Sequence, residues 1–163
     1  IEPLISGGTG SRSDSEEVPE FMPDRFEAGT INLPGIAGLH AALNYLKTYG
    51  SKNILARELA LTQRFLDGAL RLPNTRVVGK TDTQGRAAIV SLDFLTRDNA
   101  EVAFRLDQEY GVMTRCGLHC APRAHQTLGT FPKGTVRFSF SHHNTEEEVD
   151  LCLKGLKSIL EEA

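Results

Sequence analysis

The sequence predicts an α+β fold, with a small, mainly antiparallel sheet and helices packed on one face. The apolar spacing changes along the chain from helical to alternating and back, and the elements follow in the order ααββαββα with short connections. The clearest strand covers residues 135–141, where Val136, Phe138 and Phe140 alternate with polar positions such as Arg137. Such alternation is typical of a sheet with one buried side, which the helices would cover.

Two long helices are expected after an irregular arm that is rich in Gly, Ser, Pro and acidic residues. Pro34 suits the first turn of the first helix, and Gly50 suits its end. The second helix is expected to begin at Ser51, which can cap it, and to end at Pro73. Both helices have apolar residues at helical spacing: Ile36, Leu39, Leu43 and Leu46 in the first, and Leu55, Leu59, Leu66 and Leu70 in the second.

The rest of the chain is expected to hold short strands and two more helices. The predicted strands cover residues 75–79, 87–94, 112–115 and 135–141. Helical spacing returns over 99–110, and Gly111 closes that helix. The last helix begins at Thr145, because its hydroxyl and the carboxylate of Glu148 have the spacing of a capping box.

The composition excludes several classes of protein. With 163 residues, 40% of them apolar and 24% charged, the chain can bury one ordinary core and is not of the disordered type. A formal net charge of −3 argues against nucleic acid or an anionic membrane as partner, and no apolar run approaches the roughly 20 residues that span a bilayer. The odd number of cysteines, three, argues against a disulfide framework and predicts a reduced, cytoplasmic protein.

Cys120 is the candidate nucleophile of this chain. A cysteine reacts as its thiolate, so it needs exposure and positive charge nearby. Gly117 loosens the backbone of the turn that holds Cys120, and Arg115 and His119 lie close to it in the sequence. We expect Pro122 to stop regular structure just after the thiol. This polar, flexible setting favours a reactive cysteine.

The same segment offers an alternative in the form of a metal site. Cys116, His119, Cys120 and His125 are four possible zinc ligands within a short stretch. The spacing lacks a second pair of ligands, however, so no metal is expected. Cys116 is expected to pack at a strand end, and Cys152 to be a core residue on the apolar stripe of the last helix.

Arg137 and the segment 27–32 are two further candidates, and each has two open interpretations. Arg137 stands on the polar side of an apolar strand, either in a surface ion pair that contributes little or as a fork that holds a substrate carboxylate. The spacing favours neither. Residues 27–32 combine small residues with the hydroxyl of Thr30, which suits a phosphate cradle, although Gly-Thr pairs are common in loops.

Taken together, these segments resemble the class V aminotransferase family, and within it the second group of cysteine desulfurases and selenocysteine lyases. The matching stretches are residues 26–30 with Asn32, residues 35–39, residues 115–122, and residues 136–139 with 144–145. They follow the family's order over nearly the whole chain. The ordered set is therefore more specific than any one stretch.

The resemblance implies the small C-terminal domain of a fold-type I, pyridoxal-phosphate-dependent enzyme that releases sulfur from L-cysteine and leaves L-alanine. Such enzymes are homodimers in which the cofactor is an electron sink, and a loop cysteine takes the sulfur as a persulfide for an acceptor protein, for example in iron–sulfur cluster assembly. Carried over by motif, Cys120 matches the persulfide-forming cysteine, and Arg137 matches the arginine that holds the substrate carboxylate. Thr30 matches the residue that reaches the cofactor phosphate of the partner subunit. Arg115 and His119 match residues beside the substrate.

The sequence departs from the family pattern at three points. The loop of the family usually has one more residue between the alanine and the proline than this chain, in which Ala121 and Pro122 are adjacent. Leu118 stands where a histidine is common in the family. The motif that carries the cofactor lysine is also missing before Gly7, since the lysines all come later: Lys47, Lys52, Lys80, Lys133, Lys154 and Lys157. These departures leave a related lyase, such as a selenocysteine lyase, as an alternative.

The missing lysine motif and the start at Ile1 without an initiator methionine lead to the expectation of a fragment. Residues 1–33 would be an arm that joins a missing cofactor-binding large domain, and residues 34–163 would be the small domain. The chain alone would then be inactive. The alternative from another class is a non-catalytic dimerisation or binding module.

Overall fold

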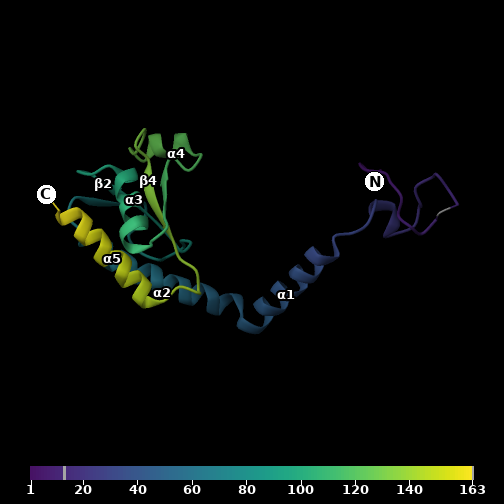
Figure 1. Cartoon of the computed structure of the whole chain (residues 1–163), viewed down its shortest axis with the longest axis horizontal. Helices are drawn as coiled ribbons and strands as arrows, with labels where there is room; N and C mark the ends of the chain where they lie inside the picture. Colours follow the sequence, from purple (N-terminus) through teal and green to yellow (C-terminus); the bar gives the residue numbers. More distant parts are fainter. Residues whose placement is uncertain (13, 163) are drawn as a thin grey trace. The chain divides into compact units, whose positions relative to one another are not determined.

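The computed structural model describes residues 1–12 and 14–162 and is traced in Figure 1. The chain divides into two compact units, Ile1–Tyr49 and Gly50–Ala163, and each is described by itself. The boundary between these units falls after the first long helix. The division at residue 33 into an arm and a domain stays a prediction about the parent enzyme, because compactness in this chain alone does not test it.

The first unit holds a short 3-10 helix, η1 (Asp24–Phe26), and the long helix α1 (Leu33–Tyr49). The side-chain oxygen of Asn32 accepts a hydrogen bond from the backbone N–H of Gly35 at 3.0 Å, which satisfies one free donor at the start of α1. The predicted first helix is confirmed. Its apolar side chains are exposed in this chain: Leu33, Ile36, Leu39, Leu43, Tyr45, Leu46 and Tyr49.

The second unit is built on a four-stranded antiparallel sheet, with the strands in the order β1-β2-β4-β3. The strands are β1 (Thr75–Val78), β2 (Ile89–Phe94), β3 (Arg115–Gly117) and β4 (Thr135–Ser139). In this register Leu92 of β2 lies opposite Val136 of β4, so one side of the sheet is apolar across its centre. The predicted antiparallel sheet is confirmed.

Three helices cover the apolar side of this sheet: α2 (Ser51–Ala69), α3 (Asn99–Tyr110) and α5 (Glu146–Glu161). Figure 1 shows α2 and α5 running along one side of the strands. Phe65 of α2 is fully buried, and its ring centroid lies 4.7 Å from that of Phe138 in β4. The remaining core residues come from all these elements: Leu61, Leu66, Ala69, Val90, Leu92, Phe94, Val102, Leu106, Val136, Val149, Cys152, Leu156 and Ile159.

The ends of the helices follow the sequence signals. Thr145 and Glu148 form the predicted capping box, in which each side chain bonds the backbone N–H of the other residue. Gly111 ends α3 in the left-handed conformation at φ 65°, which a glycine adopts without strain. Asp98, which was not singled out from the sequence, caps the start of α3 through its carboxylate.

Two local predictions are wrong. The third strand covers 115–117 rather than 112–115, because only those residues pair with β4 before the chain diverges from it. Pro122 does not stop regular structure; it starts the short helix α4 (Pro122–Thr127). A proline is tolerated in the first helical turn because the N–H that it lacks would have no partner there.

Within the described ranges 1–12 and 14–162, no helix is long and apolar enough to cross a membrane.

Candidate functional site

The side of the sheet away from the helices brings two arginines together. Arg137 of β4 pairs directly with Arg115 of β3 on one side and with Ser91 of β2 on the other. Residues that are opposite each other in an antiparallel pair project from the same face, so the two guanidinium groups are neighbours. Two like charges placed in this way repel each other unless an anion lies near them. The geometry therefore favours an anionic ligand on this face.

Cys120 lies in a tight turn beside Arg115. The backbone N–H of Ala121 bonds the carbonyl of Leu118 at 2.8 Å and closes the turn around His119 and Cys120. Both enclosed residues have positive φ angles, 51° and 60°, which few non-glycine residues adopt. Cys120 is exposed, and Arg115 donates from Nη2 to its Sγ at 3.9 Å. This contact places positive charge where a thiolate would form.

His119 lies in the same turn, and its surroundings favour the neutral imidazole. Its Nε2 lies 3.3 Å from the hydroxyl oxygen of the buried Thr135 on β4. Partial burial, followed by the charges of Arg137 and Arg115, lowers the pKa of His119 below its usual range. Its Nδ1 is buried and has no hydrogen-bond partner among the residues that the structure describes. A neutral ring can accept a proton from a group beside it.

The other two cysteines have different surroundings. Burial raises the pKa of Cys152 to about 12, so this thiol stays protonated and unreactive at neutral pH. The prediction of a core role for Cys152 is therefore confirmed. Cys116 is exposed rather than packed as predicted, because β3 is the edge strand of the sheet.

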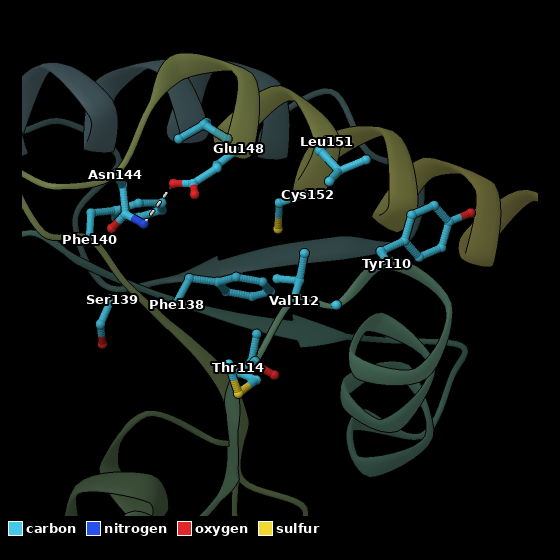
Figure 2. A pocket seen from close by; sticks show the side chains of 13 residues that line it. Tyr110, Val112, Thr114, Phe138, Ser139, Phe140, Asn144, Glu148, Leu151 and Cys152 are labelled. Atoms are coloured by element: carbon cyan, nitrogen blue, oxygen red, sulfur yellow. Dashed lines mark hydrogen bonds between the residues drawn. The ribbon is translucent and has the colours of Figure 1, made fainter.

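A cavity of about 390 Å³ lies away from Cys120, between α5 and the segment that leads into β3 (Figure 2). Cys152 and Phe138 form part of its wall, and Figure 2 shows both beside Val112. None of the arginines of the polar face lines this cavity. The candidate reactive site is thus separate from this cavity.

Two further sequence candidates are Thr30 and His125. Thr30 belongs to the first unit, where it is exposed after Gly29, a residue with a φ of 81°. His125 was considered as a zinc ligand, but its Nδ1 lies 2.7 Å from the hydroxyl of Thr130. Across residues 1–12 and 14–162, no three His, Cys, Asp or Glu side chains gather as a metal site. The structure gives the zinc alternative no support.

Thr135 and the His125–Thr130 pair were missed as members of the site. Thr135 could have been found, because it alternates in phase with Arg137 along β4 and so shares its face. His125 and Thr130 offered no such signal, since their contact depends on how α4 ends.

Comparison with known proteins identifies the family. The family described as Aminotransferase class-V matches residues 1–152 of this chain. The chain belongs to the class-V aminotransferase family. Its resemblance to the cysteine desulfurases of this family is also confirmed, because the relatives and solved structures described below carry that name.

Two curated relatives are each called a probable cysteine desulfurase. The protein of Methanothermobacter thermautotrophicus is 33% identical over 162 residues, which cover 98% of this chain and 40% of the relative. The protein of Streptomyces coelicolor is 33% identical over 163 residues, which cover 98% of this chain and 38% of the relative. The class-V chain thus spans about two fifths of the length of these relatives.

Solved structures agree with the predicted fold. A cysteine desulfurase from Thermococcus onnurineus in its apo form superposes with a TM-score of 0.75 at 34% identity, over 85% of this chain and 34% of that one. The cysteine desulfurase CsdA of Escherichia coli, solved as its S-sulfonic acid, gives a TM-score of 0.78 at 28% identity, over 98% and 39% of the two chains. The predicted α+β class, as a piece of a fold-type I pyridoxal-phosphate enzyme, is confirmed.

Proposed function

We propose that this chain is the substrate-facing part of a pyridoxal-phosphate-dependent cysteine desulfurase, in which Cys120 receives the sulfur of L-cysteine. The observation that carries the proposal is the position of Cys120 beside Arg115, whose strand neighbour is Arg137. An amino-acid substrate has a carboxylate for one arginine and a sulfur for the thiolate. The names of the relatives and neighbours support the same reaction.

In the proposed reaction the thiolate of Cys120 attacks the sulfur atom of the substrate. A sulfur–sulfur bond forms and the carbon–sulfur bond of the substrate breaks, so the products are L-alanine and a persulfide on Cys120. We assign the removal of the thiol proton before the attack to His119, because its lowered pKa favours the neutral ring. Arg115 stabilises the negative charge on the attacking sulfur.

Arg137 is proposed to hold the substrate carboxylate. Its Nε is buried and has no hydrogen-bond partner within the described part of the chain, although a buried guanidinium N–H normally has one. A carboxylate bound by two parallel hydrogen bonds would supply that partner. Arg115, directly opposite on β3, adds a second positive charge on the same face.

The proposal includes pyridoxal phosphate as the cofactor. Thr30 is exposed, and its hydroxyl is therefore accessible to a phosphate group. The preceding Gly29 borders open space, since a Cβ added there would meet no atom within 4 Å. An exposed hydroxyl fits the phosphate of the cofactor, and Thr30 would donate a hydrogen bond to the phosphate across a subunit boundary. When bound, pyridoxal phosphate supplies the electron sink for cleavage of the carbon–sulfur bond.

The covalent attachment of the cofactor is assigned to the part of the relatives that this chain does not match. Lys133 is unsuited to that role, because it forms an ion pair with Asp93 and bonds the carbonyl of Phe94. The proposal also takes the parent enzyme to be a cytoplasmic homodimer that passes sulfur to an acceptor protein, as in iron–sulfur cluster assembly. A selenocysteine lyase with the same residues is the alternative activity.

The full gene product that contains this sequence provides the test of the function. Purified with pyridoxal phosphate, it is expected to show the absorbance band of the bound cofactor. It should also release alanine and sulfide from L-cysteine in equal amounts when a thiol reductant is present. A product that binds the cofactor but leaves cysteine unchanged would contradict the proposal, and alanine from selenocysteine alone would favour the lyase.

Arg137→Lys in the full gene product is expected to lower kcat/KM for L-cysteine about 100-fold. Lysine keeps the charge but cannot make the two parallel hydrogen bonds to a carboxylate, and charge-assisted bonds are worth about 1.5–3 kcal/mol. Steady-state kinetics of alanine formation measure this change. Arg123→Lys, at an exposed position of α4, is the matched control and should retain the original kcat/KM. Equal effects of the two changes would remove Arg137 from its role.

A further inference from the structure

The turn that holds Cys120 belongs to the segment that connects β3 to β4 and contains α4. Two non-glycine residues with positive φ at its tip, His119 and Cys120, need surrounding contacts to hold them. The turn continues directly into α4, where the N–H of His125 bonds the carbonyl of Ala121 at 3.2 Å. The position of the thiol therefore depends on what fixes α4.

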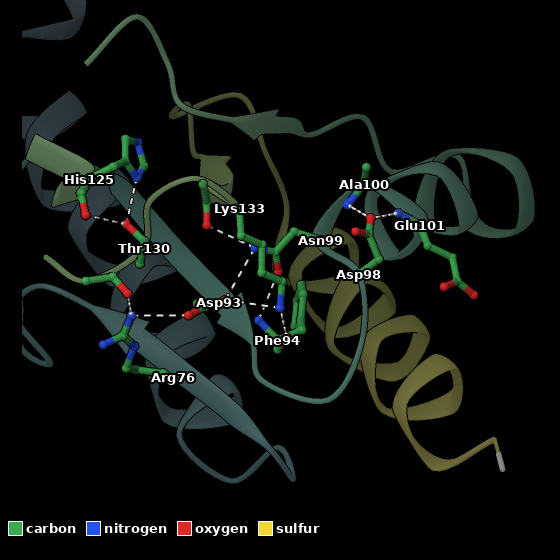
Figure 3. A network of polar contacts seen from close by, with 12 residues as sticks. Arg76, Asp93, Phe94, Asp98, Asn99, Ala100, Glu101, His125, Thr130 and Lys133 are labelled. Carbon is green, nitrogen blue, oxygen red and sulfur yellow. Dashed lines mark hydrogen bonds and ion pairs between the residues drawn. The ribbon is translucent and has the colours of Figure 1, made fainter. Parts of the chain in front are cut away.

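His125 and Thr130 fix the end of α4 by three contacts with each other, one of which is a bond from the Thr130 hydroxyl to the carbonyl of His125 at 3.4 Å. The side chains are only 5% and 3% exposed, and Nδ1 of the ring lies 2.7 Å from the hydroxyl of Thr130. The backbone N–H of Thr130 also bonds the carbonyl of His125 at 2.9 Å. Figure 3 shows this pair at one side of the polar network. A buried bond of this kind resists opening, because breaking it leaves two polar groups unpaired.

The loop over residues 129–134 is tied to the sheet and to the start of α3 at several points. Arg76 of β1 donates to the carbonyl of Gly129 at 3.4 Å, and Asn99 donates to the carbonyl of Gly134 at 3.0 Å. Lys133 pairs with the buried carboxylate of Asp93, which Arg76 also binds (Figure 3). These bonds hold the loop in place, and the His125–Thr130 pair connects α4 to this loop.

The ring of His125 also lies next to the site itself. Its centroid is 5.8 Å from that of His119, whose Nε2 is held by Thr135 on β4. We propose that the buried His125–Thr130 pair is a latch that holds the turn in the geometry placing Cys120 against Arg115. His125 and Thr130 would then be positioning residues that touch neither substrate nor cofactor. Their role in catalysis rests on the proposed function, whereas the latch rests on the contacts alone.

The test compares two alkylating reagents at Cys120 in the full gene product. Iodoacetate is an anion and iodoacetamide is neutral, and both react with the same thiolate. The ratio of their rates therefore reports positive charge beside the sulfur. Arg115 and Arg137 are the charged groups near the turn, and the rings of His119 and His125 are the other ionisable groups there. Labelling is resolved between Cys116 and Cys120 by fragment-ion mass spectrometry.

In the wild type the ratio of the alkylation rates with iodoacetate and iodoacetamide is expected to be about fivefold higher at Cys120 than at Cys116. The guanidinium in contact with the Cys120 sulfur attracts the iodoacetate anion. His125→Leu and Thr130→Val should each lower the ratio at Cys120 toward that at Cys116, which itself stays constant. His125→Asn should retain the wild-type ratio, because its amide can replace Nδ1. The double change His125→Leu with Thr130→Val should lower the ratio no further than Thr130→Val alone, because the Thr130 hydroxyl takes part in both side-chain bonds of the pair.

Thr130→Val keeps the shape of the side chain, so it remains informative where His125→Leu does not fold. A folded Thr130→Val protein with the wild-type ratio at Cys120 would overturn the latch. So would a wild type in which both cysteines have the same ratio. A wild type with the expected ratio but without alanine formation would instead refute the proposed function and leave the latch standing.

If the latch and the proposed function both hold, Thr130→Val is expected to lower kcat for L-cysteine about tenfold and to change KM less than twofold, because substrate binding by Arg137 is unaffected.

Discussion

Cys120→Ser in the full gene product is expected to abolish persulfide formation and the release of alanine from L-cysteine. A hydroxyl is a far weaker nucleophile toward sulfur than a thiolate, and Cys120 is the thiol that contacts Arg115. Intact-protein mass spectrometry after incubation with cysteine measures the added sulfur atom. The cofactor absorbance should remain, since the change leaves the cofactor-binding residues in place.

Cys116→Ser is the matched control for this change. Cys116 is also exposed and lies four residues before Cys120, but it alternates to the other side of β3 from Arg115. Its replacement should leave the added sulfur and the alanine yield unchanged. Loss of the persulfide in both variants, or its survival in Cys120→Ser, would remove Cys120 from the role of sulfur acceptor.

Gly134→Ala is expected to destabilise the second unit by about 3 kcal/mol or more, which is at the upper end of single substitutions. A Cβ at this position would lie 2.3 Å from the backbone carbon and oxygen of Gly117, and backbone atoms of a paired strand cannot move aside cheaply. Its φ of 73° adds the strain of a left-handed conformation. Urea unfolding of the full gene product, followed by circular dichroism, measures the loss.

Gly129→Ala separates the two causes of that loss. Gly129 lies in the same loop and has a similar φ of 67°, but a Cβ there would meet nothing within 4 Å. Its replacement should cost only the conformational strain, about 1 kcal/mol. If the two alanine variants lose the same stability, the close approach of Gly134 to Gly117 is not the reason for the glycine.

The elements and the chemistry of single residues could be predicted because they depend on local pattern. Helices α1, α2, α3 and α5 and three of the strands lie close to their expected places, since apolar spacing and capping residues such as Thr145 act within one element. The buried state of Cys152 followed from its place on an apolar stripe. The family resemblance came from short motifs in order, and the family match confirms it.

The arrangement around Cys120 needed the tertiary structure. Arg115 and Arg137 are far apart in sequence, and only the register of β3 against β4 makes them neighbours. The same pairing decided where β3 begins, which the alternation of residues 112–115 had placed too early. The contact of His125 with Thr130 depends on how α4 ends and on the anchored loop beyond it. A cysteine in a polar turn with Arg115 nearby is visible in sequence, but the second charge, on Arg137, comes from strands that pair across the fold, because contacts between distant segments carry no local signal.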